Sequence, residues 1–440
     1  MNKRLCFLLL MTIVLLVVAG CSDHRENAKE DAAMNGKWTG SIEVSNQSLA
    51  FIVNLKKDDE WTGTISIPAQ GVKDYPLSSV TVDGEQVSFF MEIQGEQLSF
   101  SGTFANESIA GNFSQRGQTF SFKLTKGSPV KEDDGNFLHV ETDKGTLYGE
   151  VEQPDGQGPF PVMIIIPGSG PTDRNGNSSG VQGENNSLKM LAERLAEQGI
   201  ASVRYDKRGV GKNVEAAIPE NELLFDQLVD DAVAWTELLA QDDKYANIGI
   251  IGHSQGSLVG MLAAQQGDVN TFISLSGAGR TIDQVLYSQL QSQLPDGLLQ
   301  EAKDILGKMK QDYQVQKNIS QELQNLFRPS VQDFLASWMA YDPSEEIASL
   351  DMSVLLVNGG RDLQVPVSEA ELLRKAKPDA DRLVLEKMNH VLKEAPAAEQ
   401  GNKETYGNPD LPLADGLVDG IVGFLKENDF EAERGEKNGG

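Results

Sequence analysis

The chain has 440 residues, of which 39% are hydrophobic and 23% are charged, ordinary values for a globular protein. This length predicts two or three domains with room for a full core. The formal net charge of −27 argues against partners that need a basic surface, namely nucleic acids and anionic lipid surfaces. Two cysteines exclude a disulfide scaffold and cysteine-ligated zinc, and four histidines leave little for a histidine metal site.

The N-terminus has the pattern of a secretory signal. Two basic residues precede an apolar run over residues 5–20, which is too short to span a bilayer comfortably as a permanent helix. The run ends in Val18-Ala19-Gly20-Cys21, which is similar to the lipobox of bacterial lipoproteins. We therefore expect residues 1–20 to be a signal peptide and Cys21 to receive the lipid.

A lipidated Cys21 would place the protein outside the cytoplasm, anchored to a bacterial membrane by acyl chains rather than by charge. The other cysteine, Cys6, would leave with the signal, so the mature chain would have no disulfide. Residues 21–34 are polar and read as a flexible tether.

Residues 35–126 consist of short alternating runs separated by glycine-containing turns. Trp38-Thr39-Gly40-Ser41-Ile42 recurs as Trp61-Thr62-Gly63-Thr64-Ile65, and apolar residues occupy mainly every second position over 86–93. We predict eight or nine antiparallel strands forming a small barrel or sandwich. The segment has no histidine and no reactive set of side chains, so we expect its aromatics to form a core. Contact with glycans or cell wall is a hypothesis for this domain.

A charged linker over residues 127–136 precedes a different pattern, which continues to residue 428 before a polar tail over 429–440. Nearly continuous apolar runs, typical of parallel strands buried on both faces, alternate here with amphipathic helices. This alternation predicts an open α/β sheet with helices on both faces and functional sites at the carboxyl ends of its strands. The predicted strands include residues 162–166, 248–251, 272–275 and 354–357.

Between the last two of these strands lies a long insertion rich in leucine and glutamine. We expect it to form a helical lid over about 280–346, above the carboxyl edge of the sheet; a decorative insertion is the alternative. Helix-forming stretches cover residues 282–293, 298–315, 320–327 and 331–339.

Two pentapeptides fit the pattern G-x-S-x-G, and their surroundings separate them. Gly176-Asn177-Ser178-Ser179-Gly180 lies in a polar loop. Gly252-His253-Ser254-Gln255-Gly256 follows an apolar strand and opens a helix-like stretch over 257–264. A nucleophile elbow requires this strand–turn–helix context, so we predict Ser254 as the nucleophile. A serine that merely shapes a tight turn is the alternative.

The predicted base is His390, because it is the one histidine that follows Ser254 in the chain order Ser, Asp, His. His253 adjoins the nucleophile, but we expect its side chain to point elsewhere and to serve packing.

The predicted acid is Asp362, which follows the strand over 354–357. Asp351 precedes that strand and is at its wrong end, and Asp342 in the insertion is a weaker competitor. For the oxyanion, we expect one backbone N–H from Gln255 and a second from Ser169, with Gly170 next.

These motifs give the chain a family resemblance. Over about residues 137–428 it resembles the α/β-hydrolase fold, in the bacterial esterase-like branch beside serine aminopeptidases and prolyl oligopeptidase-type hydrolases. The matching segments are residues 167–176, residues 204–211 and the elbow. The resemblance implies Ser254, Asp362 and His390 as a triad and hydrolysis through an acyl-enzyme, without metal or organic cofactor.

One departure concerns the second oxyanion donor, because many relatives have His-Gly where this chain has Pro167-Gly168. We expect Asp206 and Arg208 to brace the loop after the next strand, with substrate contact as the alternative. We expect Arg174 to form a salt bridge, with binding of an anionic substrate as the alternative.

The sequence therefore predicts a lipid-anchored serine carboxylesterase acting on small or medium carboxylic esters. A serine peptidase acting on short peptides and a catalytically silent binding protein are the alternatives.

Overall fold

A computed structural model describes residues 33–44, 47–67, 72–93, 96–115, 117–126, 136–178, 183–291, 293–312 and 316–430. The chain divides into two compact units, Met1–Lys131 and Glu132–Gly440. The predicted signal peptide, Cys21, nearly all of the tether and linker, and the polar tail from residue 431 lie outside the described residues. Among the described helices, none is long and apolar enough to cross a membrane.

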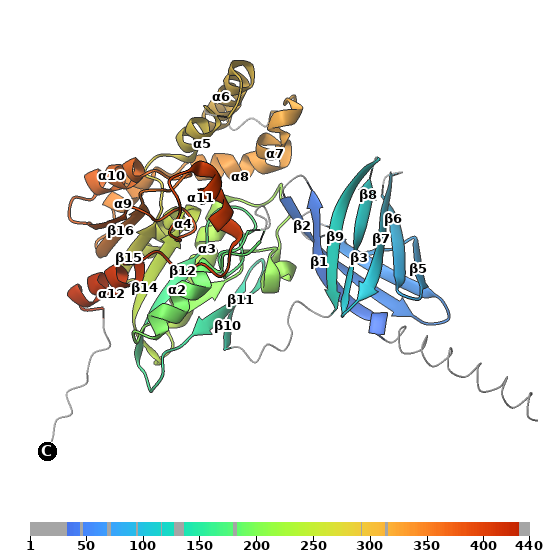
Figure 1. The fold of residues 1–440 in the computed structure, drawn as a ribbon, viewed down its shortest axis with the longest axis horizontal. Coiled ribbons are helices and arrows are strands. Elements are labelled where there is room, and N and C mark those ends of the chain that lie inside the picture. Colours follow the sequence, from blue (N-terminus) through green and yellow to red (C-terminus); the bar gives the residue numbers. More distant parts are fainter. Residues whose placement is uncertain are drawn as a thin grey trace, which may run out of the picture. The chain divides into compact units, whose positions relative to one another are not determined.

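The first unit is a nine-stranded antiparallel sheet in the order β4-β3-β2-β1-β9-β8-β7-β6-β5 (Figure 1). Its edge strands β4 and β5 are joined by Leu77 and Ser78 alone. Leu77 N donates to Gly63 O at 2.9 Å and Ser78 N donates to Phe90 O at 2.8 Å, so the two ends of the sheet meet at this corner. The strands are β1 (Gly36–Val44), β2 (Gln47–Lys57), β3 (Trp61–Ile67), β4 (Val72–Pro76), β5 (Ser79–Asp83), β6 (Gln86–Ile93), β7 (Glu96–Ala105), β8 (Ser108–Gln115) and β9 (Gln118–Lys126).

Aromatic side chains fill the interior of this curled sheet, as the alternating pattern predicted. Phe100 stacks on Phe89 with ring centroids 4.7 Å apart and on Phe51 at 5.3 Å. Trp38 is fully buried, and its indole N–H donates to Met34 O at 2.8 Å. These rings therefore act as core packing.

The second unit is built on an eight-stranded sheet in the order β10-β11-β13-β12-β14-β15-β16-β17. The β10–β11 and β11–β13 pairs are antiparallel, and every pair from β13 to β17 is parallel. Each predicted apolar run is a strand of the parallel part, and every residue of β12 is buried. The strands are β10 (Phe137–Thr142), β11 (Gly145–Glu152), β12 (Phe160–Ile166), β13 (Ala201–Tyr205), β14 (Tyr245–His253), β15 (Thr271–Leu275), β16 (Ser353–Gly359) and β17 (Asp381–Leu385).

Helices cover both faces of this sheet, because alternate strand residues point to opposite sides. Ile164 and Ile250 face the core that holds α3 (Phe225–Ala240), α4 (Gln255–Ala264) and α10 (Val367–Ala376). Ile165 and Ile251 face a second core that holds α2 (Ser187–Ala196) and α12 (Leu417–Glu427). The predicted three-layer arrangement is therefore present.

The insertion is helical (Figure 1). It has a small core of its own, which includes Leu306 and Phe327. The predicted helix over 320–327 is instead a 3₁₀ turn followed by one short helix. Arg328 is extended, as residues before a proline are, and this ends that helix. The elements are α5 (Ile282–Gln291), α6 (Asp296–Asp312), the 3₁₀ turn Gln321–Leu323, α7 (Gln324–Phe327) and α8 (Pro329–Met339).

The next helix, α9 (Pro343–Ala348), falls inside the predicted lid range but packs elsewhere. Its Ile347 is fully buried in the core beneath α3 and α4. The separate helical cluster therefore ends at Met339, earlier than the predicted limit near residue 346.

Candidate active site

Ser254 occupies a sharp turn between the end of β14 and the start of α4. Its backbone has φ 55° and ψ −117°, a conformation that few non-glycine residues adopt. A Cβ on Gly252 would overlap the carbonyl oxygen of Gly256, and a Cβ on Gly256 would overlap Ile166 O. The two flanking glycines are thus required by close backbone contacts, and the predicted elbow geometry is present.

The competing serine, Ser178, has a different setting. It forms an isolated β-bridge with Thr172 in the loop that follows β12. In the described residues up to 178, turns and this bridge precede Ser178, and the buried strand that an elbow requires is not there.

His390 and Asp362 are paired beside the carboxyl end of β16. His390 Nδ1 lies 2.8 Å from Asp362 Oδ2, and both side chains are buried. The other carboxylate oxygen accepts hydrogen bonds from the backbone N–H groups of Gln364 and Val365, each at 2.8 Å.

Burial alone would raise the pKa of Asp362, but His390 and the hydrogen bonds outweigh it and hold the pKa below its usual value. The carboxylate is therefore ionised and can only accept, so Nδ1 of His390 donates to it. In a neutral ring, this leaves Nε2 as an acceptor, the state that a general base requires.

No hydrogen bond joins the Ser254 hydroxyl to His390 within the described ranges. His253 instead contacts His390 directly, because its Nε2 lies 2.8 Å from the backbone oxygen of His390. The two rings are 4.9 Å apart, centroid to centroid. The expectation that His253 serves packing was therefore wrong, because its side chain makes a polar contact with His390.

Burial, together with the neighbouring His390, lowers the pKa of His253 to about 4. A neutral His253 must use its Nε2–H to donate to a carbonyl oxygen, which fixes its tautomer. Nothing local in the sequence signals this contact, since the two histidines are 137 residues apart.

The two competing acids have other positions. Asp342 is the N-cap of α9, where its side chain accepts from Ser344 N at 2.9 Å. Asp351 is exposed and precedes β16, at the opposite end of the strand from Asp362. Neither residue pairs with His390.

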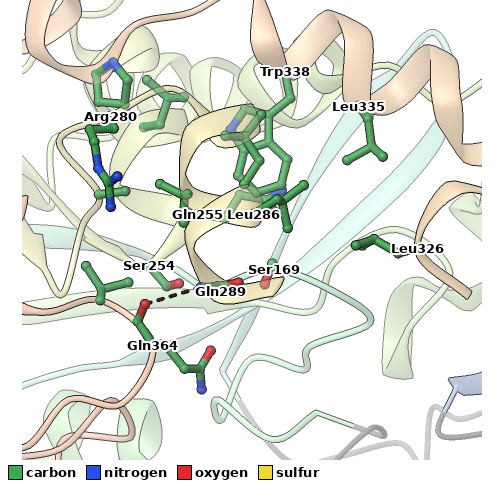
Figure 2. Close-up of a pocket in the computed structure, with 16 residues that line it drawn as sticks. Ser169, Ser254, Gln255, Arg280, Leu286, Gln289, Leu326, Leu335, Trp338 and Gln364 are labelled. Carbon is green, nitrogen blue, oxygen red and sulfur yellow. Dashed lines mark hydrogen bonds between the residues drawn. The ribbon is translucent and has the colours of Figure 1, made fainter. Parts of the chain in front are cut away.

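Both predicted oxyanion donors lie beside Ser254. Gln255 is the first residue of α4, and Ser169 lies in the loop after β12; with Ser254, they line one pocket (Figure 2). The loop is fastened through Arg174, whose backbone N–H and side chain both donate to Asp206, at 2.8 and 2.9 Å. The predicted salt bridge of Arg174 is thus present.

Arg208 braces the neighbouring segment, as predicted. Its guanidinium donates to Asp231 three times, at 3.0, 2.7 and 2.5 Å, and also to the carbonyl oxygen of Ala216 at 3.2 Å. Burial raises the pKa of Asp231 to about 6 despite this pairing.

Lys207, which sequence reasoning missed, contacts both the loop after β12 and the first turn of α4. Its Nζ donates to Gly168 O at 3.1 Å and to the side-chain oxygen of Gln255 at 2.7 Å. Burial lowers the pKa of Lys207 to about 7.

The pocket above Ser254 has a volume of about 210 Å³ and a mostly apolar lining. Leu335 and Trp338 extend toward it from α8 (Figure 2). Gln289 of α5 donates to Gln364 O at 3.2 Å, which links the insertion to the loop after Asp362. The 16 lining residues are Ser169, Ser254, Gln255, Leu258, Ala278, Arg280, Ile282, Val285, Leu286, Gln289, Leu326, Leu335, Trp338, Pro343, Gln364 and Val365.

Among the residues that line the pocket, Arg280 is the charged one, and none is acidic. Arg280 is itself paired with the buried Glu369, at 2.8 Å through Nε. Within the described residues, no group of three or more histidine, cysteine, aspartate or glutamate side chains is placed to hold a metal ion.

Residues 178–393 match the family model described as "Serine aminopeptidase, S33". The matched segment includes the elbow and the Asp362–His390 pair, whose geometry is described above. Over this segment the chain is similar to the α/β-hydrolase superfamily, and it has the fold of that superfamily. It is a hydrolase, as the resemblance of its motifs implied.

Several known proteins are similar to this α/β-hydrolase. Esterase EstD of Thermotoga maritima is 25% identical over 320 residues, which cover 71% of this chain and 73% of that protein. The solved structure of Est1E from Butyrivibrio proteoclasticus is 17% identical, covers 67% of this chain and 96% of its own, and has a TM-score of 0.41. The esterase domain of a Rhodothermus marinus protein is 12% identical, with 66% and 98% coverage and a TM-score of 0.40.

Proposed function

We propose that this hydrolase is a serine carboxylesterase for small or medium esters with an uncharged, apolar acyl group. The observation that supports it best is the hydrogen bond between Asp362 and His390 Nδ1, on a site that also holds an elbow serine. The similarity to Esterase EstD supports a carboxylic ester as the bond that is cleaved. The triad would be Ser254, His390 and Asp362.

In the proposed reaction, Ser254 Oγ attacks the ester carbonyl carbon while His390 Nε2 takes its proton. The N–H groups of Gln255 and Ser169 donate to the oxyanion that forms. His390 then returns the proton to the departing alkoxide, which leaves as the alcohol. Water attacks the acyl-enzyme with His390 again as base, and the carboxylic acid and free Ser254 are released. Asp362 keeps Nδ1 protonated and stabilises the imidazolium at both stages.

The pocket supports an apolar acyl group of limited size. A cavity of roughly 150 Å³ holds benzene, so the 210 Å³ here would take a group somewhat larger than one phenyl ring or a medium alkyl chain. Its walls include Leu286 of α5 and Trp338 of α8, so we propose that the insertion acts as the lid of this acyl pocket.

Hydrolysis of a series of p-nitrophenyl esters, from acetyl to palmitoyl, tests the proposal. We expect turnover to be highest at short or medium chains and to fall at long ones. Ser254→Ala is the control, and it should reduce kcat by about 10⁶, the loss seen when a serine hydrolase lacks its nucleophile. Retained activity in Ser254→Ala would exclude the assignment, and a peak at palmitoyl would exclude the acyl size.

A peptidase is the second candidate, because the matching family model is described as a serine aminopeptidase. An aminopeptidase needs acidic groups to bind the substrate's amino terminus, and the residues lining this pocket include none. We therefore expect amino-acyl p-nitroanilides to be hydrolysed far more slowly than the matching esters. Faster cleavage of the anilides would favour the peptidase.

We also propose that the enzyme is a lipoprotein held outside the cytoplasm by acyl chains on Cys21. The support is the sequence Val18-Ala19-Gly20-Cys21 after an apolar run. Palmitate labelling should mark the wild-type chain, and Cys21→Ser should abolish the label and release the protein from the membrane fraction. A labelled Cys21→Ser variant would contradict the proposal.

For the β-stranded unit, we propose contact with glycans or cell wall, which would make the substrate a carbohydrate ester. Retention of residues 35–126 on polysaccharide beads is the test, and absence of retention would count against it.

A further inference from the structure

Lys207 lies just beyond β13 and reaches across to the nucleophile. Its Nζ donates to Gly168 O at 3.1 Å and to Gln255 Oε1 at 2.7 Å. These acceptors belong to the two segments that would supply the oxyanion donors, namely the loop after β12 and the first turn of α4. One side chain therefore bridges both halves of the proposed oxyanion hole.

The bond to Gly168 acts on the donor peptide itself. Gly168 C=O and Ser169 N–H are the two ends of one planar trans peptide group, so they point in opposite directions. A hydrogen bond at the oxygen therefore fixes the direction of the N–H. An ammonium at the oxygen also polarises the group, which makes the N–H a stronger donor.

The bond to Gln255 acts on the second donor residue. Its side-chain oxygen is held by Lys207, while its backbone N–H at the start of α4 would face the oxyanion. The same Nζ thus sets the distance between the two donor segments.

An ordinary buried ion pair does not account for Lys207. Across the described part of the chain, no carboxylate lies within ion-pair distance of its Nζ, and the nearby Asp231 is bound by Arg208. Burying part of a lysine without a carboxylate partner is costly, yet both of its hydrogen bonds are made to the oxyanion segments.

We propose that Lys207 is a positioning residue that aligns and polarises the oxyanion donors Ser169 and Gln255. This inference rests on the proposed function, since it assumes a tetrahedral intermediate on Ser254. Lys207 does not touch the substrate in this scheme; it acts through the peptide group and side chain that it holds.

The test compares Lys207→Met with wild type in the full chain, using a p-nitrophenyl ester and a trifluoromethyl ketone of the same acyl group. The ketone forms a tetrahedral adduct on the serine and so reports on the oxyanion hole. We expect kcat to fall about 10- to 100-fold with KM within about twofold, less than the loss of a whole donor. The inhibition constant of the ketone should rise by the same factor as kcat falls.

Lys212→Met is the matched control, because Lys212 is a half-buried lysine whose ammonium lies 4.1 Å from the centroid of the Phe137 ring, away from the pocket lining. It should leave kcat and the ketone affinity at wild-type values. A second variant, Gln255→Met, removes one acceptor and keeps the backbone donor. It should lower kcat less than Lys207→Met, and the double variant should be no worse than Lys207→Met alone.

The outcomes separate the two proposals. If wild type hydrolyses the ester and Ser254→Ala does not, while Lys207→Met keeps kcat and ketone affinity, the positioning role is overturned and the esterase stands. A fall in kcat with unchanged ketone affinity also overturns it. If wild type neither hydrolyses the ester nor forms a Ser254-dependent ketone adduct, both proposals fail. If Lys207→Met does not fold, Lys207→Arg replaces it in the comparison with Gln255→Met. Effects of these two substitutions on kcat that simply add in the double variant would mean that the residues act independently, which overturns the positioning role.

Discussion

The buried carboxylate of Asp362 decides which nitrogen of His390 is free to act as a base. Three groups donate to it, His390 Nδ1 and the N–H groups of Gln364 and Val365, so the ionised form is favoured. An amide in its place could donate to Nδ1 and would favour the other tautomer, with the proton on Nε2.

We therefore expect Asp362→Asn to lower kcat by about 10⁴ while KM changes little, as loss of the tautomer does in another serine hydrolase. Steady-state kinetics on a short p-nitrophenyl ester measure this. Asp342→Asn is the control: asparagine is an equally good helix cap, so activity and Tm should both stay unchanged. A wild-type kcat in Asp362→Asn would rule this carboxylate out as the acid.

His253 gives the free energy of unfolding a specific dependence on pH. Its pKa is about 4 in the folded protein, against 6.5 for an ordinary histidine. Between pH 6.5 and 4 the unfolded chain therefore binds a proton that the folded chain does not, so stability decreases as the pH falls. The loss from this residue reaches about 3 kcal/mol at pH 4.

His253→Phe should make the decline in stability between pH 6.5 and 4 shallower than in wild type. Urea unfolding at several pH values measures it, with the exposed His139→Phe as the control that keeps the wild-type slope. An unchanged slope in His253→Phe would show that His253 takes up its proton equally in both states.

Helix α8 forms a wall of the proposed acyl pocket and also packs against helix α3. Trp338 lines the pocket and stacks on Phe225 of α3, with ring centroids 5.4 Å apart. Phe334, one turn earlier, lies 6.2 Å from the same ring but is not part of the lining. The two aromatics therefore share a packing role, and Trp338 alone reaches the pocket.

Trp338→Ala should shift the preferred acyl chain toward longer esters, because it enlarges the pocket. Both Trp338→Ala and Phe334→Ala should lower stability by about 1–3 kcal/mol, since both lose half-buried aromatic contacts. The ratio of kcat/KM for octanoyl and butyryl esters separates them and should rise only in Trp338→Ala. An equal rise in both variants would mean that loosening of α8, and not pocket volume, sets the preference.

The sequence correctly predicted the features that depend on residues adjacent in the chain. The run over 162–166 is apolar at every position because β12 is buried on both faces, and the elbow needs only its two glycines and the strand and helix around Ser254. The end of the helical insertion was misplaced, because a short amphipathic helix such as α9 does not show which of two cores it joins.

The contacts that the sequence missed join distant positions through single polar atoms. His253 meets the backbone of His390 across 137 residues, and Lys207 meets Gly168 across 39. A backbone oxygen can accept a hydrogen bond from any donor near it, whatever residue it belongs to. The sequence therefore cannot show which side chain will contact which backbone oxygen. Such contacts follow from the fold, and they surround the nucleophile here.

The two units of the chain, which divide between residues 131 and 132, have separate hydrophobic cores. The aromatic core of the first unit involves residues 34–124, and all residues that form the elbow, the pocket and the His390 pair belong to the second. Each unit therefore buries its own apolar surface, and the second contains every group of the proposed mechanism.

We expect residues 132–440 alone to fold and to hydrolyse short p-nitrophenyl esters with kcat/KM within about twofold of the full chain, because no group of the proposed mechanism is removed. Residues 33–126 should fold separately into a β-rich unit, and the full chain should unfold in two steps that match the isolated units. Circular dichroism and calorimetry of the three chains measure this. A single transition in the full chain at a higher temperature than in either piece would show that the units stabilise each other, and loss of activity in residues 132–440 would assign the first unit a direct part in forming the site.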